Sequence, residues 1–323
     1  AMYGTLALLE PDDQALVCAW VVNKFRGDVD LLRPGLEVLE QRTGRPVAGV
    51  VPWVDGVWLD GEDALAVAGW RGEHAPGVGG TVRVAVVRFP RISNATDVDA
   101  LALEPGVVVE VTADPDVVLA SDLVVLPGSR ATVADLAWLR STGLAQAVAA
   151  RASDGRPVLG ICGGHQMLAE TIVDDVESGA GTVPGLGLLP TEVRFAAEKV
   201  LGRPTGAWRG EEVTAYEIHH GTVRLRPGAA AEPFLDGWRA GAVWGTTWHG
   251  AFESDGFRRR WLEEVARQAG SAWRPTAGPG FGAVRDAMID RLADAVEEHL
   301  DTALLWRLVE QGVPDGLRVV AAG

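Results

Sequence analysis

The sequence is poor in cysteine, in positive charge and in long hydrophobic runs. Only two cysteines, Cys18 and Cys162, occur in 323 residues, too few for a disulfide framework, which favours a reducing cytoplasm. The formal net charge of −15 disfavours nucleic acid or an anionic membrane as a partner, because phosphates would repel most of the surface. No uninterrupted apolar run reaches roughly 18 residues, so we expect no membrane span.

Two further absences bear on function. Residues 1–6 lack the charged segment and cleavage site of a signal peptide. No G-x-x-x-x-G-K-[ST] loop occurs anywhere, and without such a loop there is no backbone cradle for nucleotide phosphates. We therefore predict that this chain alone binds no cofactor, and we assign no metal site.

Strand and helix patterns alternate along most of the chain. Apolar runs typical of buried parallel strands occupy residues 16–23 and 47–51, and the helical pattern between them ends near Gly44. We predict an α/β fold, with a mostly parallel open sheet and helices on both faces. Further strands are expected at 82–89, 107–111, 123–126, 158–161, 213–219 and 242–249, and helices at 133–140, 144–152, 164–172, 257–268 and 281 to about 311.

These patterns divide the chain into four segments. Residues 1–54 hold one βαβ unit, which cannot cover both faces of its own sheet, so we interpret them as part of a larger α/β domain. Residues 55–80 are rich in glycine turns and are the best linker candidate. Residues 81–272 carry the main α/β domain, and residues 273–323 are expected to form a loop and helices that pack on the preceding domains.

The most informative segment surrounds Cys162. This cysteine lies between an apolar strand and a helix and is flanked by Gly160, Gly163 and Gly164, which is the composition of a nucleophile elbow. A helix N-terminus also stabilises a thiolate through its dipole and free N–H groups. Cys18, by contrast, lies in an apolar run without glycines and is predicted to be a buried, inert thiol.

A cysteine nucleophile needs an oxyanion site and a base. The turn Pro127–Ser129 follows the strand expected at 123–126, so its N–H groups can face the end of the neighbouring strand. Among six histidines, His249 ends a strand and precedes a glycine, which favours it as the base. His219 is the alternative and more plausibly lines the cleft, whereas His165 is expected to be structural and His74 and His299 to face solvent.

Three elements in this order resemble class I glutamine amidotransferases: Pro-Gly-Ser at 127–129, Gly-Ile-Cys-Gly-Gly-His-Gln at 160–166, and His249. Further motifs resemble the cobyric acid synthase family, and they span most of the chain. They are Met2-Tyr-Gly-Thr5, Val22-Asn-Lys-Phe-Arg-Gly-Asp28, residues 91–101, Leu126-Pro-Gly-Ser-Arg130, Tyr216-Glu-Ile-His-His-Gly221 and Thr247-Trp-His-Gly-Ala-Phe252.

The resemblance implies a chemistry and a set of roles. Cys162 would attack the glutamine side-chain amide, and His249 would act as acid and then as base. Glutamine and a corrin acid would be the substrates. The complete enzyme would also need ATP and Mg²⁺. A missing N-terminal synthetase segment of P-loop type would be the partner of residues 1–54. The N–H groups of Gly128 and Gly163 would hold the oxyanion, and the residues expected to bind glutamine are Ser129, Arg130, Gln166, Tyr216 and His219.

Two departures leave alternatives open. Many relatives carry an acid two residues after the catalytic histidine, where this chain has Ala251, so a Cys–His dyad is expected, with Glu253 as a weak third member. The missing phosphate loop allows two other interpretations. The chain could be a glutaminase subunit of another amide ligase, or a glutaminase-like fragment uncoupled from any ligase.

Overall fold

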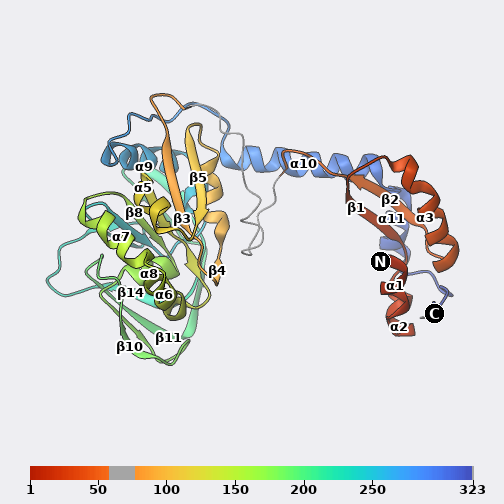
Figure 1. Ribbon diagram of the computed structural model, residues 1–323, viewed down its shortest axis with the longest axis horizontal. Coiled ribbons are helices and arrows are strands. Elements are labelled where there is room, and N and C mark those ends of the chain that lie inside the picture. Colours follow the sequence, from red (N-terminus) through yellow and green to blue (C-terminus); the bar gives the residue numbers. More distant parts are fainter. Residues whose placement is uncertain (58–76, 322–323) are drawn as a thin grey trace. The chain divides into compact units, whose positions relative to one another are not determined.

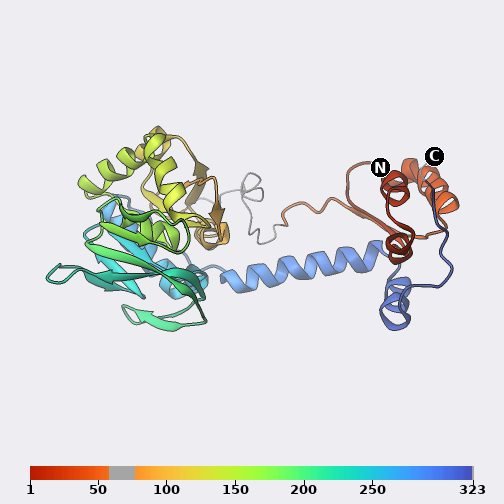
Figure 2. The same cartoon turned by 90° about the horizontal axis from the view of Figure 1, so that it is seen from below.

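The computed structural model describes residues 1–57 and 77–321, which form two compact units. One unit consists of Ala1–Trp58 and Val284–Gly323, and the other of Leu59–Ala283. Both chain ends therefore belong to the first unit, as Figures 1 and 2 show. The division at Ala283 splits the segment 273–323 between the two units. Most of the expected linker at 55–80 lies outside the described residues, and the other expected boundaries stay predictions.

The first unit is built around a short parallel βαβ motif. Strand β1 (Trp20–Phe25) pairs in parallel with β2 (Val47–Pro52), and α3 (Val29–Thr43) connects them. The Asp28 carboxylate caps the start of α3, and Gly44 ends it in the left-handed region with φ 67°. This confirms the predicted βαβ unit. Helices α1 (Met2–Ala7) and α2 (Pro11–Leu16) precede it.

The strand predicted at residues 16–23 begins too early. Leu16 is the last residue of α2, which Pro11 opens, and its side chain is 70% exposed. Cys18 consequently precedes β1 and is only partly buried, rather than lying inside the strand. Apolar runs of this length do not distinguish a helix end followed by a strand from one longer strand.

The C-terminal residues close the core of the first unit. Leu6, Trp20 and Val320 form its buried cluster. The Arg45 guanidinium is 1% exposed and donates hydrogen bonds to four carbonyl oxygens, including Val17 and Arg318. A buried cation is tolerated here because backbone acceptors satisfy its donors.

A seven-stranded sheet forms the centre of the second unit, in the order β15-β16-β17-β8-β6-β3-β5. The five strands from β17 to β5 pair in parallel, and the two at the β15 edge are antiparallel. The mostly parallel sheet predicted from the sequence is therefore confirmed. The strands are β3 (Val82–Val87), β5 (Val107–Thr112), β6 (Leu123–Leu126), β8 (Val158–Ile161), β15 (Glu232–Phe234), β16 (Gly237–Ala240) and β17 (Val243–Thr246).

Short helices connect these strands and share one buried apolar core with them. The helix predicted at 164–172 ends at Leu168, because residues Thr171–Asp174 form strand β9. The long helix predicted from 281 is two helices, α10 (Phe281–His299) and α11 (Thr302–Gln311), since Asp301 caps the start of α11. In the described part of the second unit, the other α-helices are α4 (Asp99–Ala102), α5 (Pro115–Ala120), α6 (Thr132–Ser141), α7 (Leu144–Ser153), α8 (Gly163–Leu168) and α9 (Asp255–Gln268), whereas α11 and the part of α10 from Val284 onward belong to the first unit.

A second sheet of four strands has the order β10-β9-β11-β14. Its strands are β10 (Gly181–Pro184), β9, β11 (Thr191–Gly202) and β14 (Glu217–Leu225). A separate hairpin joins β12 (Thr205–Trp208) to β13 (Glu211–Thr214). The single strand predicted at 213–219 is therefore divided between β13 and β14.

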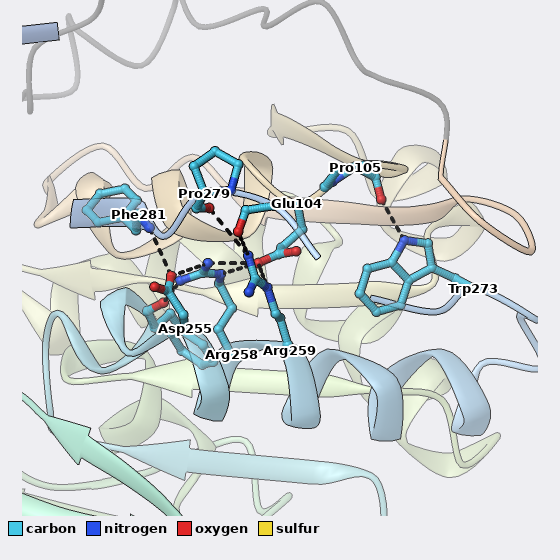
Figure 3. A network of polar contacts seen from close by, with 10 residues as sticks. Glu104, Pro105, Asp255, Arg258, Arg259, Trp273, Pro279 and Phe281 are labelled. Carbon is cyan, nitrogen blue, oxygen red and sulfur yellow. Dashed lines mark hydrogen bonds and ion pairs between the residues drawn. The ribbon is translucent and has the colours of Figure 1, made fainter. Parts of the chain in front are cut away.

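A polar network fastens α9 to Glu104 and to the start of α10 at Phe281 (Figure 3). The Glu104 carboxylate accepts hydrogen bonds from Arg258 Nε at 2.9 Å and from Arg259 Nε at 2.9 Å. Asp255 accepts from Arg258 Nη2 at 2.6 Å and from the Phe281 amide at 2.9 Å. These charge-assisted bonds pair the buried Arg258 and Glu104 with each other. Within the described residues, no helix combines the length and the apolar character needed to span a bilayer.

Candidate active site

The buried strand β8 leads directly into Cys162, the N-cap residue of α8. Cys162 has φ 49°, a strained conformation for a residue with a side chain, and its amide donates to the Thr246 carbonyl at 2.8 Å. Glycine is required on both sides of it. A Cβ on Gly160 would lie 2.7 Å from the His165 amide nitrogen, and one on Gly164 would collide with the Leu126 carbonyl. The structure thus has the predicted strand–turn–helix elbow.

His249 lies after β17, with 1% of its surface exposed. Its backbone forms a two-bond bridge with Tyr216, and the Tyr216 ring stacks on the imidazole with centroids 5.2 Å apart and planes inclined by 24°. The Asn94 amide donates to the Tyr216 hydroxyl at 2.6 Å. Tyr216 therefore holds the imidazole plane in place, and the Cys162 side chain is one of the groups that raise the pKa of His249.

A carboxylate completes this chain of contacts. Asp97, 4% exposed, lies 2.7 Å from His249 Nδ1 through Oδ2 and accepts from the Gly250 amide at 2.8 Å through Oδ1. Burial lowers the pKa of His249, but the Asp97 charge, its hydrogen bond and Cys162 raise it by more, so the pKa lies well above 6.5. The imidazolium form is thereby stabilised next to the thiol.

Asp97 was missed from the sequence, where a dyad was expected and Glu253 was the only third member considered. Residues 91–101 carry a family motif, and nothing in their local pattern predicts a contact with the histidine. The contact depends on a short pairing of β4 (Ile92–Ser93) with β7 (Gly128–Ser129), which brings the 3-10 helix η2 (Ala95–Val98) to His249. The one sequence signal for Asp97 is that this aspartate lies in a family motif to which the predicted fold assigns no role.

A pocket of about 420 Å³ opens over Cys162 and His249. The structure brings most of the predicted site residues into its lining, namely Cys162, His249, Ser129, Arg130, Gln166 and His219. Lining residues that the sequence did not single out include Ser93, Asn94, Thr132, Glu177, Lys199 and His220. Tyr216 contributes through its stacking on His249.

Two predicted glutamine-binding side chains have structural bonds of their own. Ser129 Oγ donates to Asp135 Oδ2 at 2.6 Å and accepts from the Ala131 amide. Gln166 accepts from Thr132 Oγ1 at 3.0 Å and donates to the Gly221 carbonyl at 3.3 Å. Their side chains therefore fix the pocket wall as well as facing its interior.

The two glycines predicted for the oxyanion site lie beside Cys162 and His249. A Cβ on Gly128 would lie 3.2 Å from His249 Cε1, and one on Gly163 would lie 2.8 Å from the Ser129 amide nitrogen. Substitution at either position would therefore press on the pocket wall.

The other histidines have different surroundings. His165 is completely buried, and burial lowers its pKa to about 4, in keeping with the structural role expected for it. His219 Nε2 lies 3.5 Å from Glu217 Oε2, on the same face of β14. His74 lies outside the described residues. His249, by contrast, pairs with the buried Asp97 in the pocket that Cys162 lines.

The geometry places Cys162 and the His249–Asp97 pair at one pocket of an open α/β sheet, and the comparisons with known proteins identify the family. Residues 83–257, more than half of the chain, match the CobB/CobQ-like glutamine amidotransferase domain. The chain belongs to this family of class I glutamine amidotransferases.

Within the family, the chain is similar to cobyric acid synthases, as the sequence motifs predicted. The protein of that name from Cutibacterium acnes is 58% identical over 315 residues, which are 96% of this chain and 64% of the relative. The one from Streptomyces avermitilis is 54% identical over 329 residues, covering 100% of this chain and 65% of the relative. The chain thus spans less than two thirds of the length of these curated relatives.

Proposed function

We propose that this chain hydrolyses glutamine and supplies the ammonia for a cobyric acid synthase reaction. The observation that carries the proposal is His249, held 2.7 Å from the buried Asp97, in the pocket that the strained Cys162 also lines. The names of the relatives support the particular reaction, the ATP- and Mg²⁺-dependent amidation of corrin carboxylates in cobalamin biosynthesis. Activation of the carboxylate requires a nucleotide-binding site. This sequence has no phosphate-binding loop from which such a site could form.

The mechanism begins with the thiolate. Cys162 Sγ attacks the carbonyl carbon of the glutamine side-chain amide, and the amide N–H groups of Gly128 and Gly163 stabilise the oxyanion. The His249 imidazolium donates its proton to the nitrogen, so that ammonia leaves and a thioester remains. Neutral His249 then takes a proton from water, which attacks the thioester. Glutamate leaves, and the thiolate and imidazolium are restored.

The pairing with Asp97 predicts a particular pH dependence. Replacing Asp97 with asparagine removes the charge that raises the His249 pKa, so this pKa should fall. The imidazolium exists only below its pKa, and therefore the alkaline limb of the activity profile should move to lower pH. We expect kcat/KM at the optimum to fall about 10- to 100-fold, the value of one hydrogen bond to a charged group.

The measurement is a pH profile of glutamate release for the unsubstituted chain and the variant. Asp99→Asn, two residues away, is the matched control for the loss of one charge. An unchanged alkaline limb in Asp97→Asn would show that Asp97 does not set the protonation of His249.

The proposed function itself is tested by incubating the chain with glutamine, ATP, Mg²⁺ and a corrin acid. We expect glutamate and free ammonia in equal amounts, and no amide product or ATP cleavage. Adding the nucleotide-binding segment of a relative as a separate polypeptide should restore amide formation. Failure to release glutamate, with or without that segment, would refute the glutaminase assignment, whereas ATP cleavage by the chain alone would refute the division of labour.

A further inference from the structure

Two charged side chains in the pocket have no part in the chemistry at Cys162. They are Glu177 and Lys199, and both line the pocket that contains the reacting pair. Burial, the largest influence, raises the pKa of Glu177, while the hydrogen bond from the Thr132 amide and the nearby Lys199 side chain lower it by smaller amounts. The pocket therefore brings an acidic and a basic group within electrostatic reach of each other.

A rigid turn presents Glu177 to the pocket. Asp174, at the end of β9, is completely buried and accepts hydrogen bonds from the amides of Val176, Glu177 and Ser178 at 3.1, 2.7 and 3.0 Å. Burial raises the pKa of Asp174, but these bonds and the Ser178 hydroxyl lower it by more. Asp174 therefore stays charged and fixes the backbone on both sides of Glu177.

Hydrogen bonds link Glu177 to the nucleophile elbow. The Thr132 amide donates to Glu177 Oε1 at 3.3 Å, and the Thr132 hydroxyl donates to Gln166 Oε1 at 3.0 Å. Gln166 lies one turn along α8, where its amide donates to the Cys162 carbonyl at 2.9 Å. A carboxylate has more acceptor positions than this one amide occupies, so Glu177 can accept further donors from a ligand.

A bulge in strand β11 places Lys199 at the pocket. In the pairing of β11 with β14, Phe195 lies opposite Gly221 and Val200 lies opposite His219. The four residues 196–199 of β11 therefore lie opposite the single residue His220 of β14. The extra residues form a large β-bulge in β11. Bulges of this kind redirect side chains next to active sites. The bulge places Lys199 in the lining of the pocket although the strand continues past it.

We propose that Glu177 receives the α-ammonium group of glutamine and that Lys199 faces its α-carboxylate. Free glutamine carries this pair of opposite charges on one carbon, at the end of the molecule remote from its reacting amide. A pocket with a thiolate for the amide and both charges for the head group selects free glutamine over amides that lack a zwitterion. The inference rests on the proposed glutaminase function. It adds the side chains by which the pocket would distinguish glutamine from other amides.

The test compares glutamine with glutaramic acid, which has the same side-chain amide and carboxylate but no α-amino group. We expect the unsubstituted chain to prefer glutamine, and Glu177→Gln to raise KM for glutamine about 10- to 100-fold. The kcat value should change little, because the ammonium contact is equally strong in the ground and transition states. For glutaramic acid, kcat/KM should be unchanged or higher, so the variant should lose the preference.

Asp175→Asn is the matched control, since it removes one exposed negative charge from the same turn without being part of the pocket lining. Glu177→Asp should keep part of the preference for glutamine. If Glu177→Gln retains the full preference for glutamine over glutaramic acid, the inference is wrong while the glutaminase function stands. If the unsubstituted chain hydrolyses neither amide, the proposed function fails and the inference falls with it.

Discussion

Replacing Cys162 with serine is expected to lower glutamine hydrolysis by about a thousandfold or more, as removal of a nucleophile generally does. Sulfur and oxygen differ little in volume, so the strained turn at Cys162 and the helix that follows should persist. A hydroxyl is far less acidic than a thiol, and the imidazolium of His249 cannot hold it as the anion. The measurement is the rate of glutamate release at saturating glutamine.

Cys18→Ser is the matched control within the same chain. Cys18 is the other free cysteine, is partly buried in the first unit and has no place in the pocket. This variant should keep full activity, and both variants should unfold at nearly the same temperature as the unsubstituted protein. More than a few per cent of the activity in Cys162→Ser would remove Cys162 from the role of nucleophile.

The elbow was predictable because its signal is local. Within seven residues the sequence has an apolar strand, three glycines and a cysteine. This combination is typical of a tight strand–turn–helix connection. The close approaches at Gly160 and Gly164 show why no larger residue fits there. The position of His249 was predictable for a similar reason, although the strand predicted at 242–249 ends at Thr246: His249 follows this parallel strand, β17, which pairs with the strand that leads into Cys162.

Asp97 and the two charged pocket residues were not predictable in this way. The contact of Asp97 with His249 joins residues 152 positions apart, and the strand pairing that makes it involves only two residues on each side. Lys199 reaches the pocket through a bulge, and a bulge changes the face of a strand without leaving a clear pattern in sequence. Contacts that depend on strand pairing between distant residues therefore cannot be predicted from local sequence patterns.

The error at residues 16–23 has a different cause. The run of apolar residues predicts one strand, but Pro11 and the acids Asp12 and Asp13 favour a helix start just upstream. The helix that they begin extends to Leu16, and the strand starts only at Trp20. The capping signals were present in the sequence and were outweighed by hydrophobicity.

Replacing His249 with asparagine is expected to lower kcat about 10²- to 10⁴-fold, the usual contribution of general acid–base catalysis. Asparagine is preferable to alanine here because its amide can still donate to Asp97, a carboxylate that would otherwise be buried without its partner. The variant should therefore fold, which thermal unfolding can check, while it lacks a group that can protonate the departing ammonia.

His219→Asn tests the alternative base under the same conditions. His219 also lines the pocket, and its Nε2 lies 3.5 Å from Glu217 Oε2, so we expect a change in KM with kcat nearly preserved. The contrast between the two variants decides the assignment. A larger loss of kcat in His219→Asn than in His249→Asn would make His219 the base and leave the Asp97–His249 pair with a structural role only.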